Sequence, residues 1–294
     1  SEALRAEIEA CMDRAVLEDL YLPYKKAKKT KAAVARDKGL APLAELLWEQ
    51  VLGKESIEEV AATFVDAAKQ VATAAEALEG ASHICAERVS LAVDVRSKLR
   101  DEMLVNGRIA ASPAKSAENQ RTKYEAYYKF SEAIATIPSH RFLAIHRGAK
   151  EGVLRIAFEL DDAAMIESLA ARFVKEPGSP FEPFVRAYVE DAYARLLRPS
   201  IENEVERLVQ RRADEEAVRV FRENAQNLLL APPAGSLVVL GLDPGIRTGC
   251  KVAVVNGTGT YVESAVIHPT APQNNVEGAE RILSDLIERH GVQA

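Results

Sequence analysis

Cysteine is scarce in this sequence, with three in 294 residues. Cys11, Cys85 and Cys250 lie far apart, and none has a second cysteine or a histidine at the spacing typical of a zinc site. Three dispersed cysteines also do not form a disulfide framework. We therefore expect three reduced, small and mostly buried side chains.

Long hydrophobic runs are also missing. No apolar stretch approaches the roughly 18 to 20 residues that a membrane-spanning helix needs, and the first five residues lack the basic-then-apolar order of a signal peptide. We expect a cytoplasmic protein without membrane contact. Residue 1 already has the character of a helix interior, and an apolar segment begins near Val292. We therefore expect a fragment of a longer chain.

Neither an excess of basic charge nor a common catalytic motif is present. The net charge is -6, so any contact with nucleic acid must come from a local patch. The sequence has no GxSxG, P-loop, HExxH or Rossmann motif, which argues against an independent enzyme. The histidines have no spacing suited to a metal, and we expect a structural hydrogen bond for His140; they are His83, His140, His146, His268 and His290.

Up to about residue 230 the sequence is rich in alanine, and its apolar residues recur mainly at helical spacing. Ser56 and Glu59 form a capping box that predicts a helix start. Apolar residues from Ile84 to Met103 predict one helix, which we expect to end at Asn106-Gly107 in the left-handed conformation common after helices.

The next segments alternate between helix and strand signals. A helix is predicted from Tyr124 through Ile134, ending before Pro138. Partial alternation over 153–160 predicts a short strand, and Asp161-Asp162 can cap a helix over 163–173. From Pro199-Ser200 to residue 230 the spacing predicts one helix of about eight turns at 3.6 residues each.

Pro232-Pro233-Ala234-Gly235 marks a change to β-rich composition. The run 237–242 is apolar without alternation, which is typical of a strand buried on both faces. Strands are predicted over 251–255 and 260–267, joined by a hairpin, and a helix over 276–290. The sequence thus predicts a helical domain over residues 1–234 and a strand-strand-strand-helix unit over residues 235–294.

Four separated segments resemble one protein family. Residues 240–249, LGLDPGIRTG, are similar to the first strand and turn of YqgF-type, RNase H-like domains. The other three are similar to segments of Tex-type bacterial transcription accessory proteins: 17–25 (LEDLYLPYK), 137–141 with 147–148 and 151–154, and 271–274 (APQN).

The resemblance to the Tex family implies a mainly α fold: a multi-helical core over 1–234, then an incomplete α/β RNase H-like (YqgF) domain over 235–294. It also implies helix-hairpin-helix elements and an OB-fold RNA-binding domain elsewhere in a longer chain. In the RNase H-like order the strand 237–242 is central, so we expect an unpaired edge and self-association of this chain.

Asp243 is the candidate metal ligand, because the resemblance places a Mg²⁺-binding carboxylate of RNase H-like nucleases at this strand end. Two such ions would activate water and stabilise the leaving oxygen. Mg²⁺ needs several oxygen ligands, and nothing in the sequence places Glu263 or Asp285 beside Asp243. Two alternatives stay open: plain Asp-Pro-Gly turn chemistry, and a phosphate-binding turn with Gly245 and Thr248-Gly249, which would need a second phosphate loop.

A basic cluster is the candidate nucleic-acid contact, and it stands beside Tyr21 and Tyr24. The cluster consists of Lys25, Lys26, Lys28, Lys29 and Lys31. Lysines can neutralise phosphates regardless of base sequence, and tyrosines can stack on bases. The alternative is a solvated charged face, with Leu20, Tyr21 and Leu22 anchoring the segment to the core.

These observations lead to one functional prediction. We expect a non-enzymatic, nucleic-acid-associated scaffold of transcription or RNA metabolism, with RNA or DNA and the transcription or translation machinery as partners and without a cofactor. The alternative is a Mg²⁺-dependent nuclease or resolvase in the full-length protein. A third hypothesis is a protein-interaction module that presents the long helix 201–230.

Overall fold

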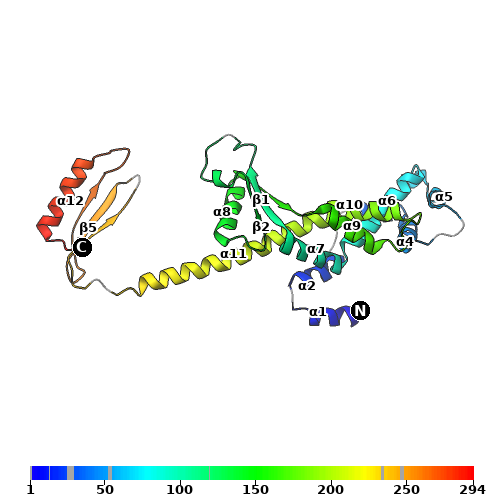
Figure 1. Ribbon diagram of the computed structural model, residues 1–294, viewed down its shortest axis with the longest axis horizontal. Coiled ribbons are helices and arrows are strands. Elements are labelled where there is room, and N and C mark those ends of the chain that lie inside the picture. Colours follow the sequence, from blue (N-terminus) through cyan, green and yellow to red (C-terminus); the bar gives the residue numbers. More distant parts are fainter. Residues whose placement is uncertain are drawn as a thin grey trace. The chain divides into compact units, whose positions relative to one another are not determined.

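The computed structural model (Figure 1) describes residues 2–12, 14–24, 30–51, 55–118, 120–232, 235–245 and 248–294. By its contacts the chain divides into two units, residues 1–220 and 221–294. The division falls within a long helix, so the boundary at residue 234, which composition indicates, stays a prediction. No helix of the described residues is long and apolar enough to cross a bilayer.

The first unit begins with a run of helices, of which one is the most central. They are α1 (Glu2–Ala10), α2 (Arg14–Tyr21), α3 (Lys31–Asp37), α4 (Ala41–Glu49), α5 (Ile57–Ala62), α6 (Ala74–Ser90) and α7 (Val93–Asn106). The central helix, α6, contacts α3, α4 and α5. Ser56 and Glu59 form the predicted capping box at the start of α5.

The single helix predicted from Ile84 to Met103 is two helices, α6 and α7, separated at Leu91 and Ala92. The seven-residue step from Ile84 to Leu91 fits two helical turns, so apolar spacing alone does not show the break. Gly107 follows α7 as predicted, but with φ -69 rather than a left-handed conformation. Glycine is needed there because a Cβ would lie 2.2 Å from the Met103 carbonyl oxygen.

A three-stranded antiparallel sheet follows, made of β1 (Arg108–Pro113), β2 (Phe130–Ala133) and β3 (Leu154–Glu159) in the order β2-β1-β3. The strand predicted over 153–160 is confirmed as β3. The helix predicted from Tyr124 to Ile134 is wrong: a 3-10 turn over Glu125–Tyr127 leads into β2. The spacing of the tyrosines fits a single turn as well as a longer helix. Pairing with β1 makes residues 130–133 a strand.

The remaining helices of the first unit end in the longest one of the described chain. They are α8 (Ser139–Lys150), α9 (Asp162–Phe173), α10 (Glu182–Asp191), a π-helical stretch (Ala192–Leu197) and α11 (Arg198–Leu229). Asp161 caps α9 as predicted, accepting a hydrogen bond from the Ala164 amide. The 32 residues of α11 confirm the predicted long helix. Its first half is buried at Ile201 and Val205, whereas Phe221 is 73% and Leu228 78% exposed.

The second unit contains β4 (Val239–Asp243), β5 (Cys250–Val255), β6 (Tyr261–Ile267) and α12 (Val276–His290). The strands form an antiparallel sheet in the order β4-β5-β6, which confirms the predicted order of elements. The small core consists of Val252, Val254, Ile267, Ala279 and Leu286.

Strand β4 differs from its prediction in burial. Its residues Gly241–Asp243 are exposed, so the expectation of a strand buried on both faces is wrong for this half. On the edge away from β5, the Gln293 amide donates to the Val238 carbonyl at 2.8 Å, and the Leu240 amide donates to the Ala294 carbonyl at 2.9 Å. Backbone groups of the last two residues thus occupy part of this edge. The predicted self-association is untested.

Candidate nucleic-acid interface

A buried cluster of charged side chains connects helix α2 to the rest of the first unit. Asp19 is 1% exposed and accepts hydrogen bonds from Arg96 and Arg100 of α7. The Arg100 Nε also donates to Glu204 of α11 at 2.8 Å, and Arg96 lies 3.5 Å from the same carboxylate. Because buried charges are costly unless paired, this ion cluster of Asp19, Arg96, Arg100 and Glu204 holds three helices in register.

The electrostatics of Arg100 follow from this packing. Burial opposes its charged form, but hydrogen bonds to Asp19 and Glu204 outweigh that effect, so the pKa of Arg100 is raised above its ordinary value. The guanidinium is therefore permanently charged and fully engaged. The role of the ion cluster is structural, because its two carboxylates are paired with arginines and are not available for acid–base catalysis.

The basic segment follows directly after this fastened helix. Tyr21 and Tyr24 are 56% and 63% exposed, whereas Leu20 and Leu22 are half-buried. The alternative in which Leu20, Tyr21 and Leu22 anchor the segment is therefore wrong for Tyr21 and stays open for the two leucines. On the far side, Thr30 accepts a hydrogen bond from the Ala33 amide at 3.0 Å and caps α3, while its hydroxyl donates to Glu87. The chain is thus fixed at Asp19 and again at Thr30, on either side of residues 25–29.

Of the predicted contact residues, Lys31 lies exposed in the first turn of α3. The other four lie outside the described residues: Lys25, Lys26, Lys28 and Lys29. Arg36, the next cation along the chain, is paired with Glu87. The structure therefore brings Lys31 and two tyrosines to the surface on either side of the segment, and the lysine contacts stay a prediction.

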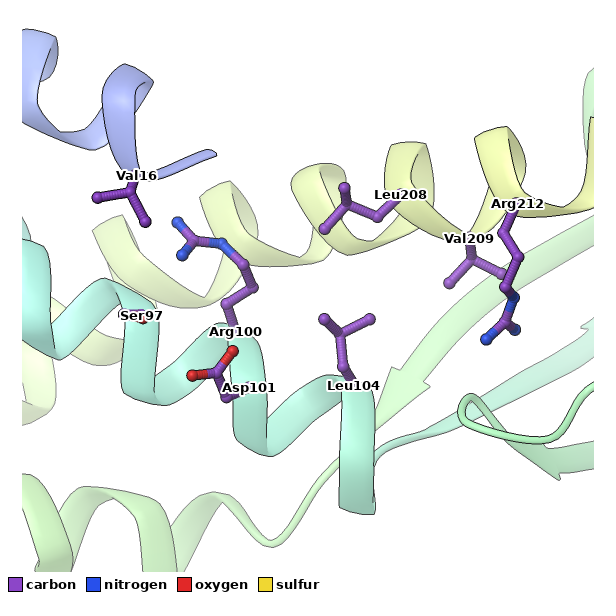
Figure 2. Close-up of a pocket in the computed structure, with 8 residues that line it drawn as sticks. All are labelled: Val16, Ser97, Arg100, Asp101, Leu104, Leu208, Val209 and Arg212. Atoms are coloured by element: carbon purple, nitrogen blue, oxygen red, sulfur yellow. The ribbon is translucent and has the colours of Figure 1, made fainter. Parts of the chain in front are cut away.

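A pocket of about 350 Å³ opens beside the ion cluster, between α2, α7 and α11. Figure 2 shows Arg100 reaching toward Val16, with Leu104 and Leu208 facing each other and Arg212 at the far end. Arg212 donates to the Ile134 carbonyl at 2.9 Å. Asp101 is the one carboxylate in the lining, and no histidine accompanies it. The charged groups of this lining are therefore one carboxylate and two arginines.

Asp243, the candidate metal ligand, is the last residue of β4 and is exposed. Further along, Gly249 has φ +83, and a Cβ there would lie 2.4 Å from the His268 ring. The Asp-Pro-Gly turn chemistry stays a prediction. Among the described residues there is no group of three or more metal-binding side chains, so a metal role for Asp243 remains a prediction.

The other acids of this unit lie elsewhere on the sheet. Glu263 is opposite Val254, whereas Asp243 is opposite Lys251, which separates the two acids by two strands and about 10 Å along them. Glu263 accepts hydrogen bonds from His290 and Arg289, which lower its pKa. Asp285 is paired with Arg289. Both carboxylates are thus paired with Arg289 of α12.

The ion cluster is the feature that the sequence analysis missed. Its signal was present: Arg96 and Arg100 are four residues apart, beside the apolar stripe Val95, Leu99 and Met103, so they share a helix face that must be buried. Two arginines on such a face require carboxylates. Asp19 lies in the segment that resembles the Tex signature. This segment therefore has a structural role, because it supplies the carboxylate that pairs with the two arginines.

Comparisons with known proteins agree with this architecture. Residues 54–221 match the family model for the Tex central region, and residues 237–294 match that for the Tex protein YqgF-like domain. The chain is 37% identical to uncharacterized protein YdcI of Bacillus subtilis, over 100% of the chain and 41% of that protein. It is 35% identical to transcriptional accessory protein Tex of Neisseria gonorrhoeae, over 100% of the chain and 38% of that protein.

A more distant relative is the human S1 RNA-binding domain-containing protein 1, which is 28% identical over 98% of the chain and 30% of its own length. The chain spans about two fifths of the length of the bacterial relatives it matches. The family models cover the first unit from residue 54 onward and the small sheet of the second unit. The chain therefore belongs to the Tex family, of which it contains the central helical region and a YqgF-like domain.

Proposed function

We propose that this chain is part of a cytoplasmic, nucleic-acid-associated transcription accessory protein, in which it serves as a non-enzymatic scaffold. The names of two relatives support this, one a transcriptional accessory protein and the other a protein with an S1 RNA-binding domain. RNA or DNA would be the ligand, and components of the transcription or translation machinery would be the protein partners.

The contacts that hold the chain on either side of residues 25–29 are the observation that carries the proposal. A flexible lysine-rich tail loses conformational entropy on binding. Here Asp19 fixes the chain before the cluster, and Thr30 fixes it between Lys29 and Lys31. Exposed Tyr21 and Tyr24 add two rings on which bases could stack. Phosphate contacts and stacking together would give affinity without sequence preference.

The test replaces Lys28 and Lys29 with glutamate and measures RNA and DNA binding by fluorescence anisotropy over a range of salt. For single strands each lost phosphate contact lowers the slope of log affinity against log salt by about 0.7, so we expect a decrease of about 1.4. The matched control is Lys115→Glu with Lys129→Glu, which makes the same charge change at two exposed positions. Equal losses in both variants, or no binding by the wild type, would refute the proposal.

A further inference from the structure

A second polar pocket, of about 630 Å³, lies between α8 and α11. We propose that it binds a phosphate group, carried either by a nucleic-acid strand or by a small phosphorylated molecule. Its lining includes His146, Lys150, Asn203, Glu206, Arg207 and Gln210. These residues belong to neither the lysine segment nor the ion cluster, and the proposal depends on the proposed function only for the source of the phosphate.

Two cations of this phosphate pocket have no acidic partner. Lys150 and Arg207 are exposed, and neither forms an ion pair within the part of the chain that the structure describes. The Arg207 Nε donates to the Asn203 carbonyl at 3.0 Å, which orients the guanidinium and leaves its two Nη groups for a ligand. A fixed guanidinium beside an ammonium is well suited to phosphate oxygens.

His146 lines the phosphate pocket, and one of its ring nitrogens has no hydrogen-bond partner within the described part of the chain. Its Nδ1 lies 3.1 Å from a Glu206 carboxylate oxygen, and because a carboxylate accepts, Nδ1 donates. The ring stacks on Phe142 at 5.8 Å, so its orientation is fixed. Nε2 is buried and has no hydrogen-bond partner among the described residues. Buried polar atoms normally have a partner, and a bound ligand or a water that it holds would supply one.

The charge and size of the phosphate pocket narrow the class of ligand. Glu206 is hydrogen-bonded to His146. The two positive charges of Lys150 and Arg207 exceed the single negative charge of Glu206, so the pocket favours an anion. The Gln210 amide also lines the phosphate pocket and is a further hydrogen-bond donor. The volume is larger than one phosphate needs and lies in the range of about 300 to 1,000 Å³ typical of ligand sites. One nucleotide unit, with its phosphate on Lys150 and Arg207, fits these properties.

The test uses the whole chain, residues 1–294, with the double variant Lys150→Gln/Arg207→Gln. The control is Lys115→Gln/Lys129→Gln, which removes the same charge from exposed positions outside the pocket. The first readout is the affinity for a single-stranded oligouridylate of about 12 residues across salt. Losing one phosphate contact should lower the salt slope by about 0.7 and the affinity about fivefold near 0.1 M salt.

The second readout is the His146 ring resonance, identified by its absence in His146→Asn, during titration with inorganic phosphate and with uridine monophosphate at constant ionic strength. Saturable shifts in the wild type and control that vanish in the double variant are expected. If the wild type shows these shifts but does not bind the oligonucleotide, a small phosphorylated molecule is the source and the proposed function alone fails. If the double variant matches the control in both readouts, or the wild type responds in neither, the phosphate pocket is refuted.

Discussion

Replacing Asp19 by asparagine should destabilise the first unit far more than an ordinary ion-pair substitution would. Asp19 faces Arg96 and Arg100, which are 5% and 4% exposed. After the substitution two buried guanidinium groups share the single carboxylate of Glu204. Removing one partner of a buried ion pair typically costs about 3 to 5 kcal/mol, and we expect a loss in this range.

Urea denaturation followed by tryptophan fluorescence measures this loss. Trp48 is the one tryptophan of the sequence, and it stacks on Tyr188 at 6.2 Å within the first unit. The control is Glu45→Gln, which breaks a pair with Arg88 whose side chains are 64% and 47% exposed. Exposed pairs contribute less than about 1 kcal/mol.

A local release of α2 would limit the effect on global stability, so tryptic cleavage within residues 14–31 is measured as well. We expect Asp19→Asn to be cleaved there faster than Glu45→Gln. If the two variants have equal unfolding free energies and equal cleavage rates, the ion cluster does not hold α2 in place, and the argument that the chain is fixed before residue 25 fails.

Two further predictions concern the surface groups. Tyr21→Ala with Tyr24→Ala should weaken binding of single-stranded RNA by about 1 to 3 kcal/mol per stacked base without changing the salt slope, as measured by anisotropy; a changed slope would mean that the tyrosines act through the lysines. If the chain is a scaffold, Mg²⁺ should produce no cleavage of labelled RNA or DNA, and Asp243→Asn should leave nucleic-acid binding unchanged. Metal-dependent cleavage that Asp243→Asn abolishes would instead support the nuclease alternative.

Local sequence signals predicted the elements whose cause is local. The capping box at Ser56, the cap at Asp161 and the long apolar repeat of α11 depend on residues within a few turns, and each is confirmed. Strand β1 was not predicted, since it is short and rich in alanine and is defined by pairing with β2 and β3. The same pairing turned the predicted helix at Phe130 into a strand.

The ion cluster is a long-range feature for the same reason. Asp19 meets Arg96 across 77 residues, and Arg100 meets Glu204 across 104. No spacing rule connects positions so far apart, although arginines on a buried helix face show that acids are needed somewhere. The phosphate pocket likewise depends on α8 and α11 lying together, which the sequence did not indicate.

Helix α11 serves as a common wall for two separate features. Residues two positions apart on an α-helix point in directions about 200° apart, so Glu204 reaches α7 while Glu206 reaches α8. Ser200 belongs to both sides, because its hydroxyl accepts from Arg96 at 3.2 Å and also lines the phosphate pocket. A rotation of α11 about its own axis would therefore change both the ion pairs that hold α2 and the shape of the phosphate pocket.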